Sequence, residues 1–320
     1  MHKDVGTLSF ADFVVSTKGT GRAWLDDVSR LLDLTCLETA LSDIYASPTG
    51  RPSYPPIVLF KALLIGAWFN LSDPGLEAAL DDSLSFRRFC SLSLEQDVPD
   101  HSTLCRFRQK LEAQGRSAEL FEQITAQLGE EGLSVRKGTL IDASLVRAQA
   151  ARPPASKGLG QSGKIDKDAN WTRKGGKSHY GYKVHIAADE QSLLIRRAIL
   201  TPAKTADGLL LEDLILGNER AVYADRAYEH KDKRARLRAR GIKDRIMHRA
   251  SKHNPVLSRW KARRNTLISP IRSQVEKLFG TLKRSYGFTQ VRFMSLARNQ
   301  VDMHIRCLAM NLRRARKLAA

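Results

Sequence analysis

The spacing of apolar residues divides this chain into a helical first part and a mixed second part. Before residue 136, apolar side chains recur at helical intervals in short segments that turn residues separate. One of these segments starts at Ser72, a good N-cap, with Pro74 in the first turn. The other predicted helices cover residues 25–44, 57–70, 84–90 and 103–111. This pattern predicts an all-helical domain over residues 1–135.

From residue 138 the pattern changes to short runs of β-forming residues that alternate with helical segments. The predicted strands cover residues 139–146, 180–186, 192–201 and 221–225, with a hairpin turn at 189–191. The predicted helices cover residues 207–216, 231–240, 271–285 and 296–317. Residues 150–178 are rich in Gly, Pro, Ser and Lys and predict a basic loop. We therefore expect a mixed α+β or α/β domain over 136–320, with a mixed central sheet flanked by helices.

Charge is distributed very unevenly along the chain. The net charge of the chain is +19. Residues 226–320 hold 26 Lys and Arg against 5 Asp and Glu, so the net charge of this segment, 26 − 5 = +21, is larger than that of the whole chain. Such a surplus favours a polyanionic partner, most simply nucleic acid, over an acidic membrane surface. The longest apolar run, 56–69, is about 14 residues, short of the roughly 18 that a spanning helix needs. With no signal peptide and four scattered cysteines, we expect a cytoplasmic protein that contacts no membrane.

Two aspartates stand in apolar strand segments, where a bare charge is costly. Asp142 interrupts the strand 139–146, and Asp225 ends the apolar run 221–224. Carboxyl ends of strands are where ligands bind in open α/β sheets. A divalent cation would neutralise both carboxylates.

A third carboxylate lies on the predicted helix 271–285. At about 100° per residue, Glu276 shares one face with Arg272 and Lys283, while the apolar residues form another face. Taken without the strand aspartates, this helix is better explained as an ordinary amphipathic helix with an i,i+4 ion pair between Arg272 and Glu276. Together with the two strand aspartates, Glu276 favours two Mg²⁺ ions, which take hard oxygen ligands and support phosphoryl transfer.

The carboxylates belong to short sequence motifs. The first acidic motif is Ile141-Asp142-Ala143-Ser144, and the second is Ala224-Asp225-Arg226-Ala227-Tyr228. Between them lies a hairpin motif, Tyr180-Gly181-Tyr182-Lys183-Val184-His185. These motifs resemble those of bacterial insertion-sequence transposases of the DDE superfamily, of the insertion-sequence-five type. Arg272, Glu276 and Lys283 match three parts of that family's Tyr-Arg-Glu-Lys signature, whose tyrosine is replaced by Ser269. The N-terminal segments 51–56, 70–73, 86–89 and 98–103 are also similar to that family.

The resemblance implies an RNase H-like catalytic domain with Asp142, Asp225 and Glu276 as catalytic residues and metal ligands. It implies two Mg²⁺ ions, with Mn²⁺ able to substitute. The implied reaction frees 3′-hydroxyls at terminal inverted repeats and transfers them into target DNA. Holding two ends together implies a homodimer or a higher assembly on DNA, in the bacterial cytoplasm and associated with the nucleoid.

The remaining candidates are basic or imidazole side chains that we expect at DNA. Arg272 and Lys283 would hold a phosphate, and Arg226 follows the second aspartate. Lys183 and His185 share a strand face that would line the substrate groove, although a structural histidine fits as well. The DNA-contact candidates in the helical domain are Arg106 and Arg108, on the last helix of a possible helix-turn-helix.

Alternatives remain at this stage. The helical domain could be a packing domain with exposed arginines instead of a DNA-reading helix-turn-helix. A magnesium-dependent nuclease that never joins ends, or a DNA-binding regulator that has lost catalysis, would share most of these features.

Overall fold

The computed structural model describes residues 2–3, 22–45, 52–133, 137–150, 165–250 and 255–319, without the side chain of residue 34. The chain forms two compact units, Met1–Leu128 with His304–Ala320, and Gly129–Met303. The first boundary lies near the expected division at 135/136. The last residues belong to the first unit, whereas the expected second domain ran to residue 320.

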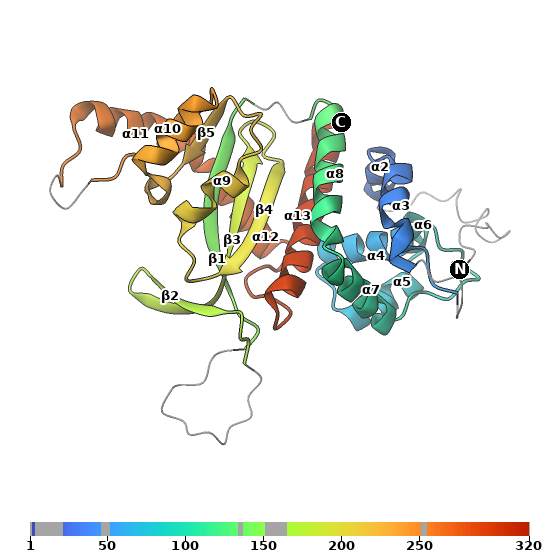
Figure 1. Cartoon of the computed structure of the whole chain (residues 1–320). Coiled ribbons are helices and arrows are strands. Elements are labelled where there is room, and N and C mark those ends of the chain that lie inside the picture. Colours follow the sequence, from blue (N-terminus) through green and yellow to red (C-terminus); the bar gives the residue numbers. More distant parts are fainter. Residues whose placement is uncertain are drawn as a thin grey trace, which may run out of the picture. The chain divides into compact units, whose positions relative to one another are not determined.

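The first unit is built from short helices that side-chain caps begin. Asp33, Ser72 and Asp100 each accept a hydrogen bond from a first-turn backbone N–H, which fixes the starts of three helices. The helices are α2 (Trp24–Arg30), α3 (Leu34–Leu41), α4 (Pro56–Trp68), α5 (Asp73–Asp82), α6 (Leu84–Cys90), α7 (His101–Ala113) and α8 (Arg116–Glu130), with a short 3-10 helix η1 (Ser42–Tyr45) (Figure 1). The long helix α13 (Leu296–Ala319) contributes residues to both units.

Helix α4 is the centre of the first unit and is buried along its whole length. The indole Nε1 of Trp68 donates a 2.7 Å hydrogen bond to the carbonyl of Ala309 in α13. No single helix in the described ranges has the length and apolar composition of a membrane span. Within the same ranges, the bent pair α4 and α5, at 105° to each other, meets both criteria when the two helices are taken together.

The second unit contains a mixed six-stranded sheet. Its strands are β1 (Thr139–Arg147), β2 (Asn170–Lys174), β3 (Lys177–Asp189), β4 (Ile195–Pro202), β5 (Ala221–Ala224) and β6 (Lys243–Ile246). The order is β2-β3-β1-β5-β6, with β4 also paired to β3. Strand β3 is antiparallel to its neighbours, whereas β1, β5 and β6 are parallel. The expected class, a helical N-terminal region followed by a mixed sheet flanked by helices, is confirmed (Figure 1).

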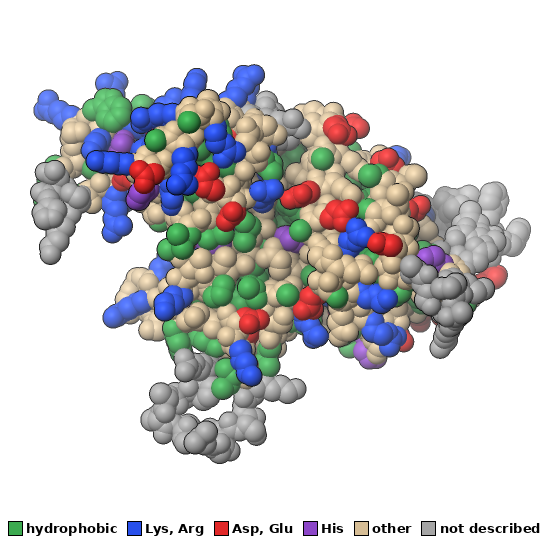
Figure 2. All heavy atoms as spheres, in the orientation of Figure 1, with side chains coloured by type: hydrophobic (Ala, Val, Ile, Leu, Met, Phe, Trp, Pro, Cys, Tyr) green, Lys and Arg blue, Asp and Glu red, His purple; other side chains and the backbone are tan. Residues whose placement is uncertain are grey.

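Short helices follow the strands of this unit. They are η2 (Asp207–Leu210), α9 (Leu211–Leu214), η3 (Arg226–Tyr228), α10 (Lys231–Ala239), α11 (Arg259–Arg272) and α12 (Gln274–Arg284). Two of them, α10 and α11, are strongly basic. Lys and Arg side chains gather over the region of α10 and α11 (Figure 2). These helices lie within the basic stretch that begins at residue 226.

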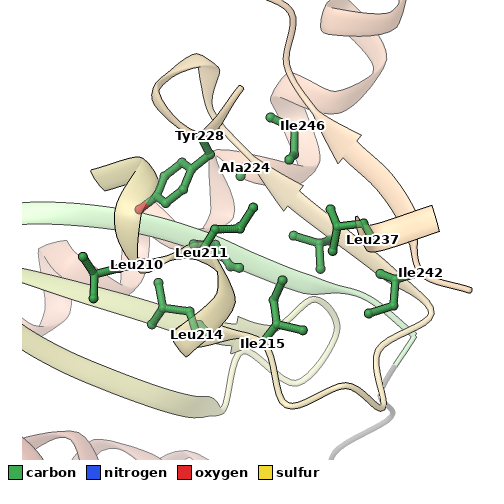
Figure 3. Close-up of a cluster of buried hydrophobic side chains, with 12 residues drawn as sticks. Leu210, Leu211, Leu214, Ile215, Ala224, Tyr228, Leu237, Ile242 and Ile246 are labelled. Carbon is green, nitrogen blue, oxygen red and sulfur yellow. The ribbon is translucent and has the colours of Figure 1, made fainter. Parts of the chain in front are cut away.

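The register of β1 and β3 assigns residues to the two faces of the sheet. Ala143 pairs with His185 and Leu145 with Lys183, so these four side chains share one face. On that face Ile141 belongs to a buried apolar cluster that includes Leu211 of α9 and Leu237 of α10; Figure 3 shows this cluster. Asp142 lies on the other face, where α12 packs against β1.

Two expectations about segment boundaries were wrong. The helix predicted over 271–285 is two helices, because α11 runs to Arg272 and α12 starts at Gln274. The predicted loop 150–178 is shorter at its end, since β2 and the start of β3 form a hairpin there. Residues 151–164 of that loop lie outside the described residues.

Candidate active site

Asp142, inside β1, and Asp225, directly after the end of β5, are neighbours on two parallel strands. Ile141 pairs with Ala224 in the β1–β5 ladder, so the next residue on each strand is an aspartate. The Asp225 carboxylate caps η3 by accepting a 2.8 Å hydrogen bond from the backbone N–H of Ala227. Asp142 accepts a 2.9 Å hydrogen bond from the N–H of Ala143. The sheet therefore brings together two carboxylates that are 83 residues apart in sequence.

Arg272 joins the third carboxylate to this pair. Its Nη1 lies 2.9 Å from Oδ2 of Asp142, and its Nη2 lies 2.6 Å from Oε1 of Glu276. The Arg272 and Asp142 side chains are only 15% and 16% exposed, whereas Glu276 is 61% exposed. The i,i+4 ion pair that the sequence allowed is thus present, and the same guanidinium also reaches the strand aspartate.

Lys283 of α12 contacts β1 two residues beyond Asp142. Its Nζ donates a 2.7 Å hydrogen bond to the hydroxyl of Ser144, which shares a sheet face with Asp142. The predicted polar face of the helix is therefore directed at β1. The apolar residues Val275, Leu278 and Leu282 are buried, as their spacing predicted.

The electrostatics of the site favour neutralisation of Asp142. Burial raises the pKa of Asp142 above its ordinary value, and the negative charge of Asp225 raises it further. The N–H of Ala143 and the guanidinium of Arg272 oppose that rise. Burial lowers the pKa of Lys283, and the nearby charge of Lys174 lowers it further. A partly buried acidic pair beside a cation is the environment expected where carboxylates must bind a cation.

The donor set suits Mg²⁺, although the described residues contain no group of three or more His, Cys, Asp or Glu placed to hold a metal ion. Asp142 and Asp225 supply hard carboxylate oxygens on adjacent strands, which is the chemistry that Mg²⁺ prefers. Here the Arg272 guanidinium supplies the positive charge between Asp142 and Glu276. The residues therefore fit a divalent cation through two carboxylates, with Glu276 held one side chain away.

Lys183 and His185 are placed differently from expectation. Both lie on the sheet face opposite Asp142. His185 is fully buried and its Nε2 lies 2.9 Å from the hydroxyl of Thr201. Burial lowers the pKa of His185 to about 4, so the imidazole is neutral. Lys183 forms a 2.7 Å ion pair with Asp207. This placement argues against direct DNA contact by either side chain, because neither shares the face of the carboxylates.

The other basic candidates separate into exposed and engaged side chains. Arg226 is exposed at the start of η3, directly after Asp225. In the first unit, Arg106 is 64% exposed. Arg108 is 12% exposed and makes two 2.6 Å hydrogen bonds with the Asp73 carboxylate, so its guanidinium serves packing between α5 and α7. The geometry of Arg108 argues against base reading.

Three residues near the site were not among the candidates. Lys174 is positioned by the β2–β3 hairpin, and its positive charge lowers the pKa of both Asp142 and Lys283. The other two residues are Asp207 and Tyr228. Burial raises the pKa of Tyr228, and the negative charge of Asp207 raises it further. Tyr228 ends the second acidic motif, which was the signal in the sequence. The position of Lys174 depends on a hairpin that the sequence did not predict.

Comparison with known proteins finds two family matches and a similar solved structure. Residues 133–312 match the family described as "Transposase DDE domain", which is more than half of the chain. Residues 16–110 match the family described as "Transposase domain (DUF772)". A solved structure, a piggyBac transposase synaptic complex with hairpin DNA, is 11% identical with a TM-score of 0.40. That alignment covers 96% of this chain and 83% of the other.

Proposed function

Since this chain belongs to the transposase DDE domain family, we propose that it is an insertion-sequence transposase that cleaves DNA at terminal inverted repeats and joins the freed 3′-hydroxyls to target DNA. The observation that carries the proposal is the adjacency of Asp142 and Asp225 on parallel strands, with Arg272 linking Asp142 to Glu276. Phosphoryl transfer needs concentrated negative charge that can hold cations beside a phosphate. We further propose the insertion-sequence-five type with the Tyr-Arg-Glu-Lys signature, in which Ser269 replaces the tyrosine.

The three carboxylates Asp142, Asp225 and Glu276 are the proposed catalytic residues and metal ligands. Two Mg²⁺ ions, or Mn²⁺ in their place, would stabilise charge on the attacking and leaving oxygens. The proposal requires Glu276 to exchange its bond with Arg272 for the cation, and its 61% exposure leaves the carboxylate accessible for that exchange.

Arg272 and Lys283 are the proposed phosphate contacts. Both reach β1 beside Asp142, and a guanidinium released from a carboxylate can bind a phosphate bidentately. Arg226 and Arg106 are exposed cations that we propose contact the DNA backbone. The basic helices α10 and α11 add a sequence-independent attraction for DNA. Two transposon ends held together imply a homodimer or a higher assembly.

A cleavage assay tests the proposal. The substrate is a labelled duplex carrying the DNA end that flanks this gene, incubated with Mg²⁺ and a supercoiled plasmid. Asp142→Asn keeps the side-chain shape but removes the charge, and Asp213→Asn changes an exposed aspartate elsewhere as the matched control. We expect cleavage and joining by the wild type and by Asp213→Asn, and neither by Asp142→Asn, which still binds the duplex.

Each of the other outcomes supports a different function for this protein or contradicts the assignment. Cleavage without joining supports a magnesium-dependent nuclease. Tight binding without either product, in Mg²⁺ and in Mn²⁺, supports a DNA-binding regulator. Robust cleavage by Asp142→Asn contradicts the carboxylate assignment.

A further inference from the structure

The β2–β3 hairpin, residues 170–181, extends past the rest of the sheet. Strand β1 pairs with β3 as far as the pair Arg147 and Gly181, and β4 pairs with β3 only from Tyr182 onward. The first four residues of β3 therefore have β2 as their one strand neighbour among the described residues. Figure 1 shows β2 projecting away from the other strands. The hairpin is thus placed to contact another molecule.

The side chains of the hairpin are exposed on both of its faces. Every residue of β2 except Thr172 is exposed, and so are Lys177 and Ser178 on the opposite strand. Trp171 is 44% exposed, although its ring lies 5.1 Å from the ring of Tyr180. Two strands that bury so little apolar surface are only marginally stable by themselves. The hairpin is therefore better explained as a contact surface than as part of the core.

The hairpin carries three cations and no carboxylate. Arg173, Lys174 and Lys177 are exposed, and residues 170–182 include no Asp or Glu. The structure shows no ion pair for these three side chains within the ranges that it describes. A polyanion is the partner that such uncompensated positive charge attracts.

Two of these cations lie opposite each other at the tip. Lys174 pairs with Lys177, so both side chains share one face of the hairpin. Like charges directly opposite each other destabilise a strand pair, and an anion bound between them removes that cost. The turn between them is Gly175-Gly176, with φ of 57° and 78°. A Cβ at either glycine would meet nothing within 4 Å among the described residues, so the tip is open to a ligand.

The hairpin is continuous with the strand beside the candidate site. Ile186 of β3 pairs with Asp142, and Lys177 lies nine residues earlier on the same strand. At about 3.3 Å per residue, nine residues span at most roughly 30 Å, the length of about nine base pairs of DNA. Lys174 also lowers the pKa of Asp142, so its charge reaches the site. A duplex bound at the carboxylates is therefore long enough to reach the hairpin.

The open edge of β2 could instead pair with a second copy of this chain. Strand β2 is at the end of the strand order, so one of its edges has no strand partner among the described residues. Pairing of two such edges would bring together two hairpins that each carry three cations and no carboxylate. Because like charges repel across a strand pair, charge favours DNA over a second copy.

We propose that the β2–β3 hairpin is a DNA-binding arm that enters a groove of the duplex within about nine base pairs of the bond to be cleaved, with Arg173, Lys174 and Lys177 bound to phosphates. The major groove of B-DNA, about 12 Å wide, admits a two-stranded β-ribbon. The inference rests on the proposed function, because it takes this duplex to be the substrate.

Binding of the labelled end duplex across a salt series tests the arm. Arg173→Gln, Lys174→Gln and Lys177→Gln are made singly and together, and filter binding is measured without divalent cation, so that no strand is cut. Each lost phosphate contact should lower the salt slope by about 1 and raise the Kd roughly tenfold at about 0.1 M salt. Lys174→Arg and Lys177→Arg keep the charge and should bind as the wild type does.

Lys137→Gln is the matched control. Lys137 is an exposed lysine of the same unit that precedes β1, whereas the hairpin lies beyond the other end of β1. We expect this control to keep the wild-type slope and Kd. An unchanged slope in the triple variant, or an equal loss in Lys137→Gln, overturns the inference.

Two further measurements locate the contact. Phosphate ethylation within about nine base pairs of the cleavage site should weaken binding by the wild type but not by the triple variant. Interference that is the same for both proteins overturns the placement. With the unpaired strand of the same length, the triple variant should lose less affinity than it loses with the duplex, and equal losses overturn the groove contact.

Stability and self-association decide between the arm and its rivals. Because the lysines are exposed and repel each other, their removal should leave the urea midpoint unchanged or raise it. A lowered midpoint would assign them to the fold and overturn the inference. Variants that alter only self-association in sedimentation would assign the hairpin to a second copy, which also overturns it. A wild-type protein that binds the duplex but cleaves none contradicts the proposed function instead, and the salt slopes then still decide whether the hairpin contacts DNA.

Discussion

The guanidinium of Arg272 lies 2.9 Å from the carboxylate of Asp142 and also contacts Glu276, so one cation spans a strand carboxylate and a helix carboxylate. This relationship joins α11 and α12 to the middle of the sheet. It also places a positive charge where the proposed reaction needs one.

Replacement of Arg272 tests how much this side chain contributes to the stability of the fold. Arg272→Gln leaves the largely buried Asp142 without its cation, and we expect a loss of about 1–3 kcal/mol in the free energy of unfolding. Urea unfolding measures the loss. Lys277→Gln removes an exposed cation from the neighbouring helix α12 and should cost less than about 0.5 kcal/mol. Equal stabilities of the two variants contradict the contact.

The raised pKa of Asp142 predicts a pH-dependent gain on substitution. The folded protein holds this proton more tightly than the unfolded chain, so ionisation of Asp142 lowers stability as the pH rises through the folded-state pKa. Asp142→Asn cannot ionise. We therefore expect it to unfold at a higher temperature than the wild type at pH 7 without metal, with the difference vanishing as the pH falls below 3.8. Thermal unfolding across this range decides the point, and a difference independent of pH speaks against it.

His185 predicts the opposite pH dependence. The unfolded imidazole protonates near pH 6.5, but burial lowers the folded-state pKa to about 4. The wild type should therefore lose roughly 2–3 kcal/mol of stability between pH 6.5 and pH 4 that His185→Gln does not lose. Urea unfolding at both pH values measures the loss, with the exposed His230→Gln as the control. The same variant should bind DNA as the wild type does; weaker binding would restore His185 as a contact.

Arg106 and Arg108 should separate binding from stability. Arg108→Gln breaks two hydrogen bonds to Asp73, and we expect a loss of about 1.5–3 kcal/mol in unfolding free energy. Arg106→Gln should leave stability unchanged and lower the salt slope of DNA binding by about 1, because one phosphate contact is lost. Filter binding across a salt series measures the slope. An unchanged slope removes Arg106 from the interface.

The sequence predicted the strands and their carboxylates better than it predicted which faces meet. Strand β1 followed from its apolar run, and the apolar stripe of α12 followed from helical spacing. Lys183 and His185 were correctly placed on one strand face. Which face that is depends on the register that pairs Gly181 with Arg147, and no local pattern encodes that register.

The short and charged elements escaped prediction for a physical reason. Strand β6 has four residues, of which three are charged, and it exists because β5 provides a parallel partner. The break between α11 and α12 at Ser273 was also missed. Pro270 lies inside α11 without ending it, although proline usually breaks a helix interior, so the local signal was misleading there.

Joining of a cleaved end to a second DNA molecule tests the central claim most directly. The labelled end duplex and the supercoiled plasmid are incubated with Mg²⁺ and, in turn, with the wild type, Asp142→Asn, Asp225→Asn, Glu276→Gln and Asp213→Asn. The account predicts labelled plasmid with the wild type and Asp213→Asn, and none with the other three at equal DNA occupancy. Labelled plasmid formed by Asp142→Asn, Asp225→Asn or Glu276→Gln at the wild-type rate would contradict it.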